Sequence, residues 1–574
     1  MGLGRKHSDE LSATEGTLYV SKPFRTKTSP KPRALFTFTP RKSAFDISNE
    51  TSGVNEFRGF YSLFWVSIFL WAIRTYITGI ETSGSPLNFA FATMFSQDAI
   101  TLAISDFFLV ISTGICVPLA GAISRGYIRY YWTGLALQHL LQTTILFTTI
   151  IWTFNRKWPW VQSGFLTLHS LVMVMKMHSY LTVNGHLRHV SEQSRLLFRR
   201  LQEVTVNFGG MEQALKDAVI PECSRMSEGN SVDTTRSGTP EVPEGSSATY
   251  IDPASAVILR KRLNAMAAEL DSNNPIQCVE EKARGTNFST TLSSISDMKE
   301  RTQPQQHPLV SHPDPVISAL ARDYSDLQME LVSRESGLVT WPQNISWKNF
   351  AEYQLIPTLV YELEYPRTNK IRPLYVFEKT AATFGTFALL YTVTEVFILP
   401  LTPTSDQSFF KSLLDLSLPF MIAYILLFYI IFECICNGFA ELSYFADRQF
   451  YEDWFIFRRW NSTSWDEFSR KWNKPVHAFL LRHIYAPLIY NCGFSKTVAM
   501  LFTFFLSAGA HELVMVVVTK KIRLYLFTLQ IVQIPLIVLS RQPILKRNKL
   551  MGNVVFWLGL YAGFPLLCVA YVAY

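Results

Sequence analysis

The sequence predicts an all-α, polytopic membrane protein with about nine membrane-spanning helices. Its 574 residues are 48% hydrophobic and 14% aromatic but only 17% charged, a composition too apolar for an ordinary soluble domain. Apolar runs long enough to cross about 30 Å of hydrocarbon recur along the chain. The net charge of +8 comes from short basic clusters beside these runs, which is typical of cytoplasmic loops and argues against a nucleic-acid partner.

Residues 1–56 predict a cytoplasmic, disordered tail. They are polar, basic and rich in Ser, Thr and Pro, and they contain no apolar core of a signal peptide. Four predicted spans follow at 57–80, 99–123, 131–154 and 160–182, and they form a first membrane block, 57–182. Arg125 and Arg129 lie in the turn between the second and third spans, which indicates that this turn is cytoplasmic.

Residues 183–345 predict a long cytoplasmic insertion that is largely disordered. Its middle has a Ser/Thr/Gly/Pro composition that buries too little apolar surface to fold. Two pieces, 190–208 and 316–336, have helical periodicity and are expected to pack against the membrane face. The glycosylation sequons at Asn287 and Asn344 are expected to stay unmodified on this side of the membrane.

Residues 346–574 predict a second membrane block. Its five spans lie near 376–401, 413–436, 497–519, 522–540 and 552–573. The segment 437–496 between them is charged and aromatic and contains no uninterrupted run of membrane length. Counting spans alternately places the tail, the insertion, the segment 437–496 and the basic loop 541–549 on the cytoplasmic side.

His511 is the first candidate for chemistry, because it lies inside the apolar span 497–519 and ionisable groups inside membranes usually have a function. Burial there would favour the neutral imidazole, which can act as a general base. The alternatives are a polar group bonded to a neighbouring helix and a metal ligand. The zinc-protease pattern HExxH fails, since Met515 stands at its second ligand position, and the seven cysteines show no metal-ligand spacing, so no metal site is predicted. Gly509 and its small neighbours would let a helix or a flat substrate approach closely.

Asn473, thirty-eight residues before His511, is the second candidate. A side-chain amide can donate to a developing oxyanion or hold a reacting hydroxyl, but an asparagine before Lys-Pro is also a common turn former. A basic cluster surrounds it among aromatic residues, and it fits either the phosphates and base of a nucleotide-like ligand or anionic lipid headgroups. The members of this cluster are Arg470, Lys471, Lys474, His477, Arg482 and His483.

Several stretches together resemble the membrane-bound O-acyltransferase family. FYEDW (450–454), WNSTSW (460–465), FSRKWNKPVHAFLLRHIY (468–485) and SAGAHE (507–512) are similar to its consecutive motifs. MKMHSYLTVN (175–184) and YELEYPRTNKIRPLYVFEK (361–379) resemble the sterol O-acyltransferase branch, in particular its fungal members. The tail and the long insertion lie outside the resemblance.

The resemblance implies a nine-span enzyme of the endoplasmic reticulum membrane that moves a fatty acyl group from acyl-CoA to a sterol hydroxyl. It implies acyl-CoA as substrate with no further cofactor, and a homodimer or larger homo-oligomer. By this resemblance the catalytic residues are His511 and Asn473. The acyl-CoA contacts fall on seven residues, Tyr451, Arg470, Trp472, His477, Tyr485, Lys496 and Ser507.

One motif departs from the family pattern FYxDWWN. Five residues, Phe455 to Arg459, separate Trp454 from Trp460, and their removal would restore FYEDWWN. Five extra residues turn the following face of a helix by about 500°, so a bulge or loop is expected there. The box itself comprises Phe450, Tyr451, Asp453, Trp454, Trp460 and Asn461.

Two other functions remain open on the sequence. A diacylglycerol O-acyltransferase would share the box and the histidine, although the long insertion and the stretch 361–379 favour the sterol branch. A non-catalytic polytopic transporter or lipid-binding scaffold would follow if the five inserted residues disable the box. Because no serine or cysteine is paired with a base in a recognisable triad, direct transfer is favoured over an acyl-enzyme.

Overall fold

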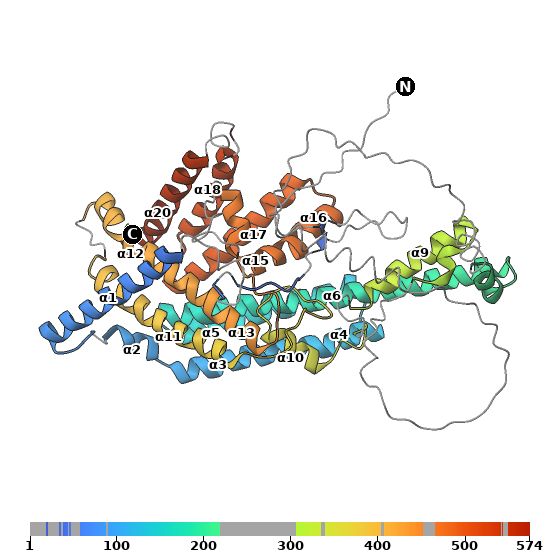
Figure 1. Ribbon diagram of the computed structural model, residues 1–574, viewed down its shortest axis with the longest axis horizontal. Coiled ribbons are helices and arrows are strands. Elements are labelled where there is room, and N and C mark those ends of the chain that lie inside the picture. Colours follow the sequence, from blue (N-terminus) through green and yellow to red (C-terminus); the bar gives the residue numbers. More distant parts are fainter. Residues whose placement is uncertain are drawn as a thin grey trace, which may run out of the picture.

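The protein is a bundle of long helices from which one helical arm projects (Figure 1). The computed structural model describes residues 19–20, 34–35, 38–43, 45–46, 58–87, 90–218, 306–333, 339–402, 407–451, 465–540, 542 and 549–573. Most of these residues are helical, and the strands among them are the two-residue pair β1 (Tyr19–Val20) and β2 (Ala34–Leu35). The prediction of a helical membrane protein is therefore confirmed for this part of the chain.

The first membrane block is organised around its last helix. In chain order it consists of α1 (Arg58–Ser83), α2 (Ala90–Ser96), α3 (Ala99–Ser112), the 3₁₀ turn η2 (Thr113–Ile115), α4 (Cys116–Arg125), the π-helix η3 (Tyr130–Gly134), α5 (Leu135–Asn155) and α6 (Trp160–Val206). Helix α6 packs against α3, α4 and α5. It approaches η3 so closely at Gly185 that a Cβ there would lie 2.3 Å from the ring of Tyr130.

The second membrane block carries the motifs. Its elements are α10 (Trp347–Leu355), α11 (Pro373–Val393), the π-helix η5 (Thr394–Ile398), α12 (Phe409–Phe428), the π-helix η6 (Tyr429–Ile435), α13 (Cys436–Leu442), α14 (Trp465–Trp472), α15 (Lys474–Leu480), the π-helix η7 (Leu481–Tyr485), α16 (Ala486–Tyr490), α17 (Lys496–Thr519), α18 (Tyr525–Ser540) and α20 (Lys549–Ala573). Helix α17 packs against α18 and also against α6, so the two blocks meet along these helices.

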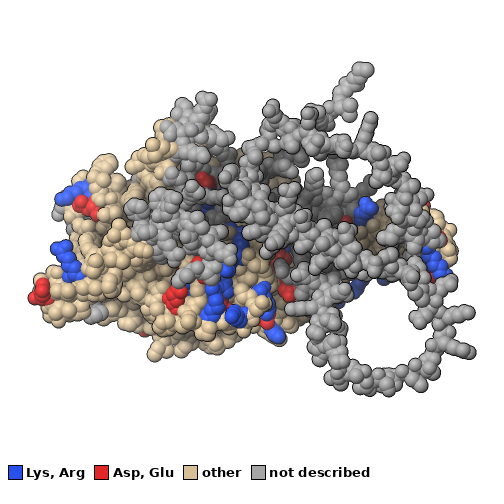
Figure 2. Space-filling model, viewed as in Figure 1, with Lys and Arg blue, Asp and Glu red and all other residues tan. Residues whose placement is uncertain are grey.

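Seven helical stretches of the described residues are long and apolar enough to cross a membrane. They are Ser62–Ser83, Ala99–Arg125, Tyr130–Asn155, Pro373–Ile398, Phe409–Leu442, Lys496–Thr519 and Leu550–Tyr571. The other two predicted spans are present as helices, but α6 is too polar to be counted and α18 has only 16 residues. The number nine therefore stays a prediction. Figure 2 shows wide uncharged areas on the face in view, with charged side chains in separate groups, the largest of them low in the centre.

Helix α6 continues through the boundary predicted between residues 182 and 183. It has 47 residues and is therefore about 70 Å long. Its distal part forms the projecting arm with η4 (Pro308–Ser311) and α9 (Pro315–Glu330) (Figure 1), around a small core that includes Leu201, Leu309 and Ile317. The helical periodicity predicted for 190–208 and 316–336 is confirmed over most of both pieces, and they pack against each other. Residues 219–305 and 334–338 of the predicted insertion, including Asn287, lie outside the described residues.

The second sequon is part of the folded core. Asn344 is 2% exposed, and its Nδ2 donates to Asn184 Oδ1 at 2.9 Å and to the Tyr361 hydroxyl at 3.0 Å. A buried amide with two acceptors cannot carry a glycan, which agrees with the prediction that this sequon stays unmodified.

Residues 38–43 and 45–46, which we call the N-terminal strap, lie within the tail that the sequence predicts to be disordered, but they are paired with the second membrane block. Arg41 forms a parallel bridge with Asp447, and the ring of Phe38 packs on Tyr365 and Phe445 with centroids 5.3 and 5.7 Å apart. Ser43 and Asp46 are 2% and 3% exposed. The strap is held because its buried polar groups meet partners that the second block supplies.

Candidate functional site

The segment after residue 464 places Asn473 at a helix start. Helix α14 ends at Trp472, and Asn473 is the N-cap of α15, with its Oδ1 accepting from the backbone N–H of Val476 at 3.1 Å. The turn-former interpretation is therefore correct for the Oδ1 atom. Because Oδ1 is used in this way, the side-chain Nδ2 is the atom that is left to donate. Through Nδ2, Asn473 can thus donate to an oxyanion.

Three predicted residues share one face of α17. At about 100° per residue, Ser507 lies about 20° around the helix from Lys496, and His511 about 40° further. Val518 lies on the same face and approaches α6, where a Cβ added at Gly164 would be 3.3 Å from its Cγ2. Helix α17 also packs against η7 and α16, the elements that follow Asn473 by a few residues. The face that helical spacing assigns to His511 therefore meets α6 at Val518, seven residues further along α17.

The imidazole of His511 has a fixed tautomer. Its Nδ1 lies 2.7 Å from the backbone carbonyl oxygen of Ser507, one turn earlier in α17. A carbonyl oxygen can only accept, so Nδ1 must carry the hydrogen of a neutral ring, and the lone pair is on Nε2. This is the form of histidine that can remove a proton from a substrate.

The side chain of His511 is not packed inside the single chain but is exposed on its surface. Glu512 is the buried member of the pair, at 4% exposure. Its carboxylate accepts from the N–H groups of Leu524 and Phe527 at 2.8 and 3.0 Å and from the Tyr571 hydroxyl at 3.0 Å. Glu512 therefore ties α17 to the start of α18 and to α20, and it fixes the helix turn that presents His511.

The described part of the box contacts the Asn473 segment directly. Phe450 accepts at its carbonyl oxygen from the N–H of Lys474 at 3.1 Å, and Lys474 Nζ donates to Gln449 at 3.3 Å. The ring of Tyr451 packs on Phe428 with centroids 5.1 Å apart. The remaining box residues Asp453, Trp454, Trp460 and Asn461, and the insert Phe455 to Arg459, lie outside the described residues.

Trp472 and Tyr485 have different surroundings. Trp472 stacks on Tyr424, with centroids 4.8 Å apart and planes 5° from parallel, and it also packs on Phe428 at 4.4 Å. Trp472 therefore packs the end of α14 against α12. Burial raises the pKa of Tyr485 in η7, which keeps its phenol protonated as a hydrogen-bond donor.

The basic residues around Asn473 do not form one patch. Arg470 is exposed, Arg482 pairs with Glu362, and Lys471 pairs with Glu467 at 2.6 Å. His483 Nε2 lies 2.8 Å from the hydroxyl of Ser179 in α6, so it links the two blocks. His477 is half-buried on α15, four residues after Asn473. Arg470 and Lys496 are the cations of the predicted acyl-CoA set that remain exposed.

The structure adds a buried carboxylate that the sequence reasoning missed. Glu433, in η6, is fully buried, and its Oε1 accepts from Lys379 Nζ at 2.8 Å. Its Oε2 accepts from the hydroxyls of Ser43 and Tyr451 at 2.6 and 2.9 Å and from Asn437 at 3.1 Å. The rule that singled out His511 would also have found Glu433, since it is an ionisable side chain inside the predicted span 413–436.

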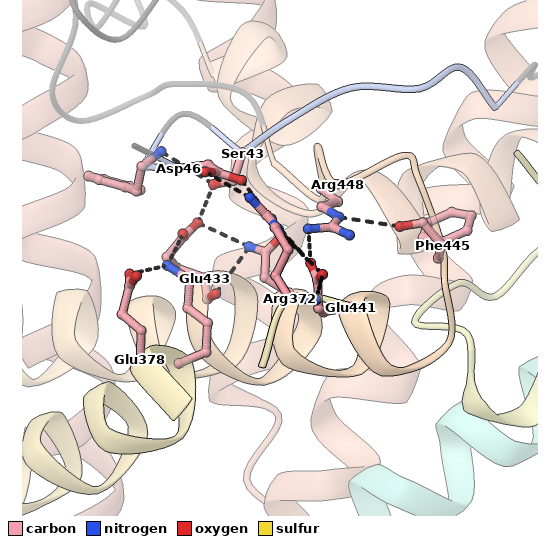
Figure 3. A network of polar contacts seen from close by, with 11 residues as sticks. Ser43, Asp46, Arg372, Glu378, Glu433, Glu441, Phe445 and Arg448 are labelled. Atoms are coloured by element: carbon pink, nitrogen blue, oxygen red, sulfur yellow. Dashed lines mark hydrogen bonds and ion pairs between the residues drawn. The ribbon is translucent and has the colours of Figure 1, made fainter. Parts of the chain in front are cut away.

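A second carboxylate lies one helical segment further along (Figure 3). Glu441 accepts from the backbone N–H of Arg372 at 2.7 Å and pairs with the guanidinium groups of Arg372 and Arg448. Arg372 also donates to Asp46 of the strap at 2.9 Å. Burial alone would lower the pKa of Arg372, but Asp46 and Glu441 raise it above its ordinary value. Among the described residues, no group of three or more His, Cys, Asp or Glu side chains is placed to hold a metal ion.

Comparisons with known proteins agree with this arrangement. The profile of the membrane-bound O-acyltransferase family matches residues 127–573. The chain is 31% identical over 549 residues to the probable sterol O-acyltransferase 1 of Schizosaccharomyces pombe, covering 94% of this chain and 86% of that protein. It is 30% identical over 553 residues to the sterol O-acyltransferase 2 of Candida albicans, covering 94% and 78%. Diacylglycerol O-acyltransferase 1 of Dictyostelium discoideum is 36% identical over 239 residues, which are 40% of this chain and 37% of that protein.

Proposed function

Since the chain belongs to the membrane-bound O-acyltransferase family, we propose that it transfers a long-chain fatty acyl group from acyl-CoA to the 3-hydroxyl of a sterol. The relatives named sterol O-acyltransferases support this acceptor, because they match 94% of the chain, whereas the diacylglycerol O-acyltransferase matches 40% of it. The product is a sterol ester for storage. The enzyme works in the membrane of the endoplasmic reticulum, as a homodimer or a larger homo-oligomer.

His511 is the general base of the reaction. Its Nε2 takes the proton of the sterol hydroxyl while the hydroxyl oxygen forms a bond to the thioester carbonyl carbon. When the tetrahedral centre collapses, its carbon–sulfur bond breaks, and the proton passes from the imidazolium to the departing thiolate. CoA leaves as the thiol, the sterol ester stays in the membrane, and the acyl group never bonds to the protein.

Asn473 and the charged end of α17 orient this reaction. The Nδ2 amine of Asn473 donates to the carbonyl oxygen of the thioester as negative charge develops there. Lys496 begins the face of α17 that bears His511, and the two residues are about 22 Å apart along the helix axis. Acyl-CoA lies along this face, with its phosphates near Lys496 and its thioester near His511.

One observation carries the proposal, which is the 2.7 Å contact between His511 Nδ1 and the carbonyl oxygen of Ser507. In the neutral ring this contact places the hydrogen on Nδ1 and the lone pair on Nε2, as the mechanism requires, and it uses a main-chain group that is present whichever substrate is bound. A structural histidine that only joined two helices would need no free ring nitrogen.

The test supplies microsomes that contain the protein with labelled oleoyl-CoA and, in separate reactions, ergosterol, cholesterol or diacylglycerol. Label in steryl ester that disappears with His511→Ala, at equal amounts of inserted protein, supports the proposal. His189→Ala is the control, because this histidine lies on α6 in the first membrane block, where its Nε2 is bonded to Gln193 and its ring packs on Tyr131. Label only in triacylglycerol would identify a diacylglycerol O-acyltransferase instead.

A further variant tests the insert in the box. Incorporation by a variant that lacks residues 455–459, without incorporation by the natural chain, would show that the insert disables an otherwise competent site. No incorporation by either form would favour a transporter or lipid-binding scaffold.

A further inference from the structure

The N-terminal strap reaches the buried centre of the second membrane block from more than 300 residues away in sequence. Its backbone is paired on both sides of Arg41, whose N–H donates to Ala446 at 3.0 Å and whose carbonyl oxygen accepts from Arg448 at 2.9 Å. The Arg41 guanidinium donates through Nε and Nη2 to the two carboxylate oxygens of Asp447 at 2.9 and 2.7 Å. Such a two-pronged pair fixes position and orientation together. The strap is therefore aligned in one register over residues 446–448, directly before the box.

Ser43 is the strap residue that reaches the site. Figure 3 shows Ser43 and Asp46 of the strap pointing to the helices that carry Glu433 and Glu441. The Ser43 hydroxyl is buried and donates to Glu433 Oε2 at 2.6 Å, the shortest of the contacts to that carboxylate. The same oxygen accepts from the Tyr451 hydroxyl at 2.9 Å. Ser43 and Tyr451 therefore both donate to the same carboxylate oxygen and together fix its position.

Tyr451 passes this restraint on to a second predicted acyl-CoA contact. Its ring packs against Phe428 with centroids 5.1 Å apart, and Phe428 packs against Trp472 at 4.4 Å. Trp472 directly precedes Asn473. Because packed aromatic rings cannot move independently, a shift of Glu433 moves Tyr451 and changes the position of Trp472.

We propose that the N-terminal strap is a positioning element of the acyl-CoA site, with Ser43 acting through Glu433 on Tyr451. This inference rests on the proposed function, since Tyr451 and Trp472 are acyl-CoA contacts only if acyl-CoA is the substrate. With the strap docked, Glu433 holds Tyr451 in the binding position. Without the Ser43 hydroxyl, the carboxylate lacks one of its four donors and moves toward Lys379, which donates to its other oxygen at 2.8 Å.

Charge makes the strap sensitive to substitution. A carboxylate at position 43 would stand beside the buried carboxylate of Glu433 and near Asp46, and like charges in a buried site repel strongly. Ser43→Asp is therefore expected to undock the strap, whereas Ser43→Ala only removes one hydrogen bond. Comparing the two variants therefore distinguishes undocking of the whole strap from the loss of one hydrogen bond.

The experiment measures initial rates against oleoyl-CoA concentration for the full-length chain in microsomes, and binding of a non-hydrolysable acyl-CoA analogue to the same preparations. We expect Ser43→Ala to raise KM and the analogue Kd about fivefold, the net effect of one typical hydrogen bond, with kcat nearly unchanged. Ser43→Asp should raise both constants further, and Ser43→Thr, which keeps the hydroxyl, should restore them. Ser325→Ala is the matched control, because it removes a buried hydroxyl on α9 of the projecting arm.

A double-mutant cycle with Tyr451→Phe tests whether Ser43 acts on the acyl-CoA site through Tyr451. If Ser43 acts through Tyr451, Ser43→Ala raises the Kd little further once the tyrosine hydroxyl is gone. If the two substitutions raise the Kd by independent factors that multiply in the double mutant, the proposal is overturned. It is also overturned if Ser43→Ala lowers the amount of folded protein while the protein that does fold keeps its KM. The binding readout needs no acceptor, so a protein that binds the analogue normally but esterifies no sterol would refute the proposed function and leave this inference standing.

Discussion

The proposed mechanism gives Asn473 a second role besides the capping of α15, on a different atom, and substitution can separate the two roles. Its Oδ1 caps α15 by accepting from Val476 at 3.1 Å, and its Nδ2 is the donor that the mechanism aims at the thioester oxygen. Asn473→Ser keeps a capping oxygen but has no amine, and Asn473→Ala has neither. Loss of one oxyanion donor costs about 3 kcal/mol in the transition state, which is a factor of about 150 in rate. Loss of an N-cap costs about 1 kcal/mol of folding stability.

We therefore expect both variants to lose activity by about two orders of magnitude, while only Asn473→Ala melts at a lower temperature than the natural chain. The assay is the initial rate of steryl oleate formation in microsomes, divided by the amount of folded protein from fluorescence-detected size-exclusion chromatography. Melting is followed with the same chromatography after heating. An Asn473→Ser variant that keeps more than about a tenth of the activity would refute the oxyanion role. Equal melting of the two variants would refute the capping role.

Substitutions at Glu512, Asn344 and Gly185 test the packing of the fold by the same melting assay, with further variants for comparison. Glu512→Ala should lower stability by about 3 kcal/mol or more, because it leaves two N–H groups at the start of α18 and a tyrosine hydroxyl without their acceptor, and Glu512→Gln should lose less. Asn344→Ala should lower the free energy of unfolding by about 1–3 kcal/mol, because it removes two buried hydrogen bonds. Since Asn344 is expected to carry no glycan, glycosidase treatment should remove none from this residue in the natural chain. Gly185→Ala should cost about 1–3 kcal/mol, since the new Cβ would lie 2.3 Å from the Tyr130 ring, whereas Gly509→Ala, with open space around it, should be neutral or stabilising.

The helices with unbroken apolar runs could be predicted closely from the sequence. The span expected at 131–154 is found within Tyr130–Asn155, and that expected at 497–519 within Lys496–Thr519. Helix α6 could not be delimited in the same way. Its second half buries polar residues such as Asn184 and Ser194, which bond to other parts of the chain and which read in the sequence as the start of a polar insertion. Local hydropathy cannot distinguish a polar side chain that is satisfied by packing from one that faces water.

The site was predictable where its residues follow one another along a helix and not where they meet across the fold. The shared face of Lys496, Ser507 and His511 follows from helical spacing alone. The contact between Ser43 and Glu433 joins residues 390 positions apart, and no periodicity signals it. The resemblance gives the motif residues their expected roles, but it does not reach the tail, whose composition alone predicts disorder.

The exposure of His511 is a requirement of the proposed chemistry. The outward stripe of α17 is apolar and consists of Val498, Phe502, Phe505 and Gly509, and His511 lies about 200° around the helix from Gly509. The imidazole is therefore exposed on a different side from the stripe that would meet lipid. A base that was fully packed could not be reached by a hydroxyl group, so the anchoring of α17 falls to the buried Glu512 next to it. Neighbouring residues on a helix point about 100° apart, which lets one hold the helix while the other faces the substrate.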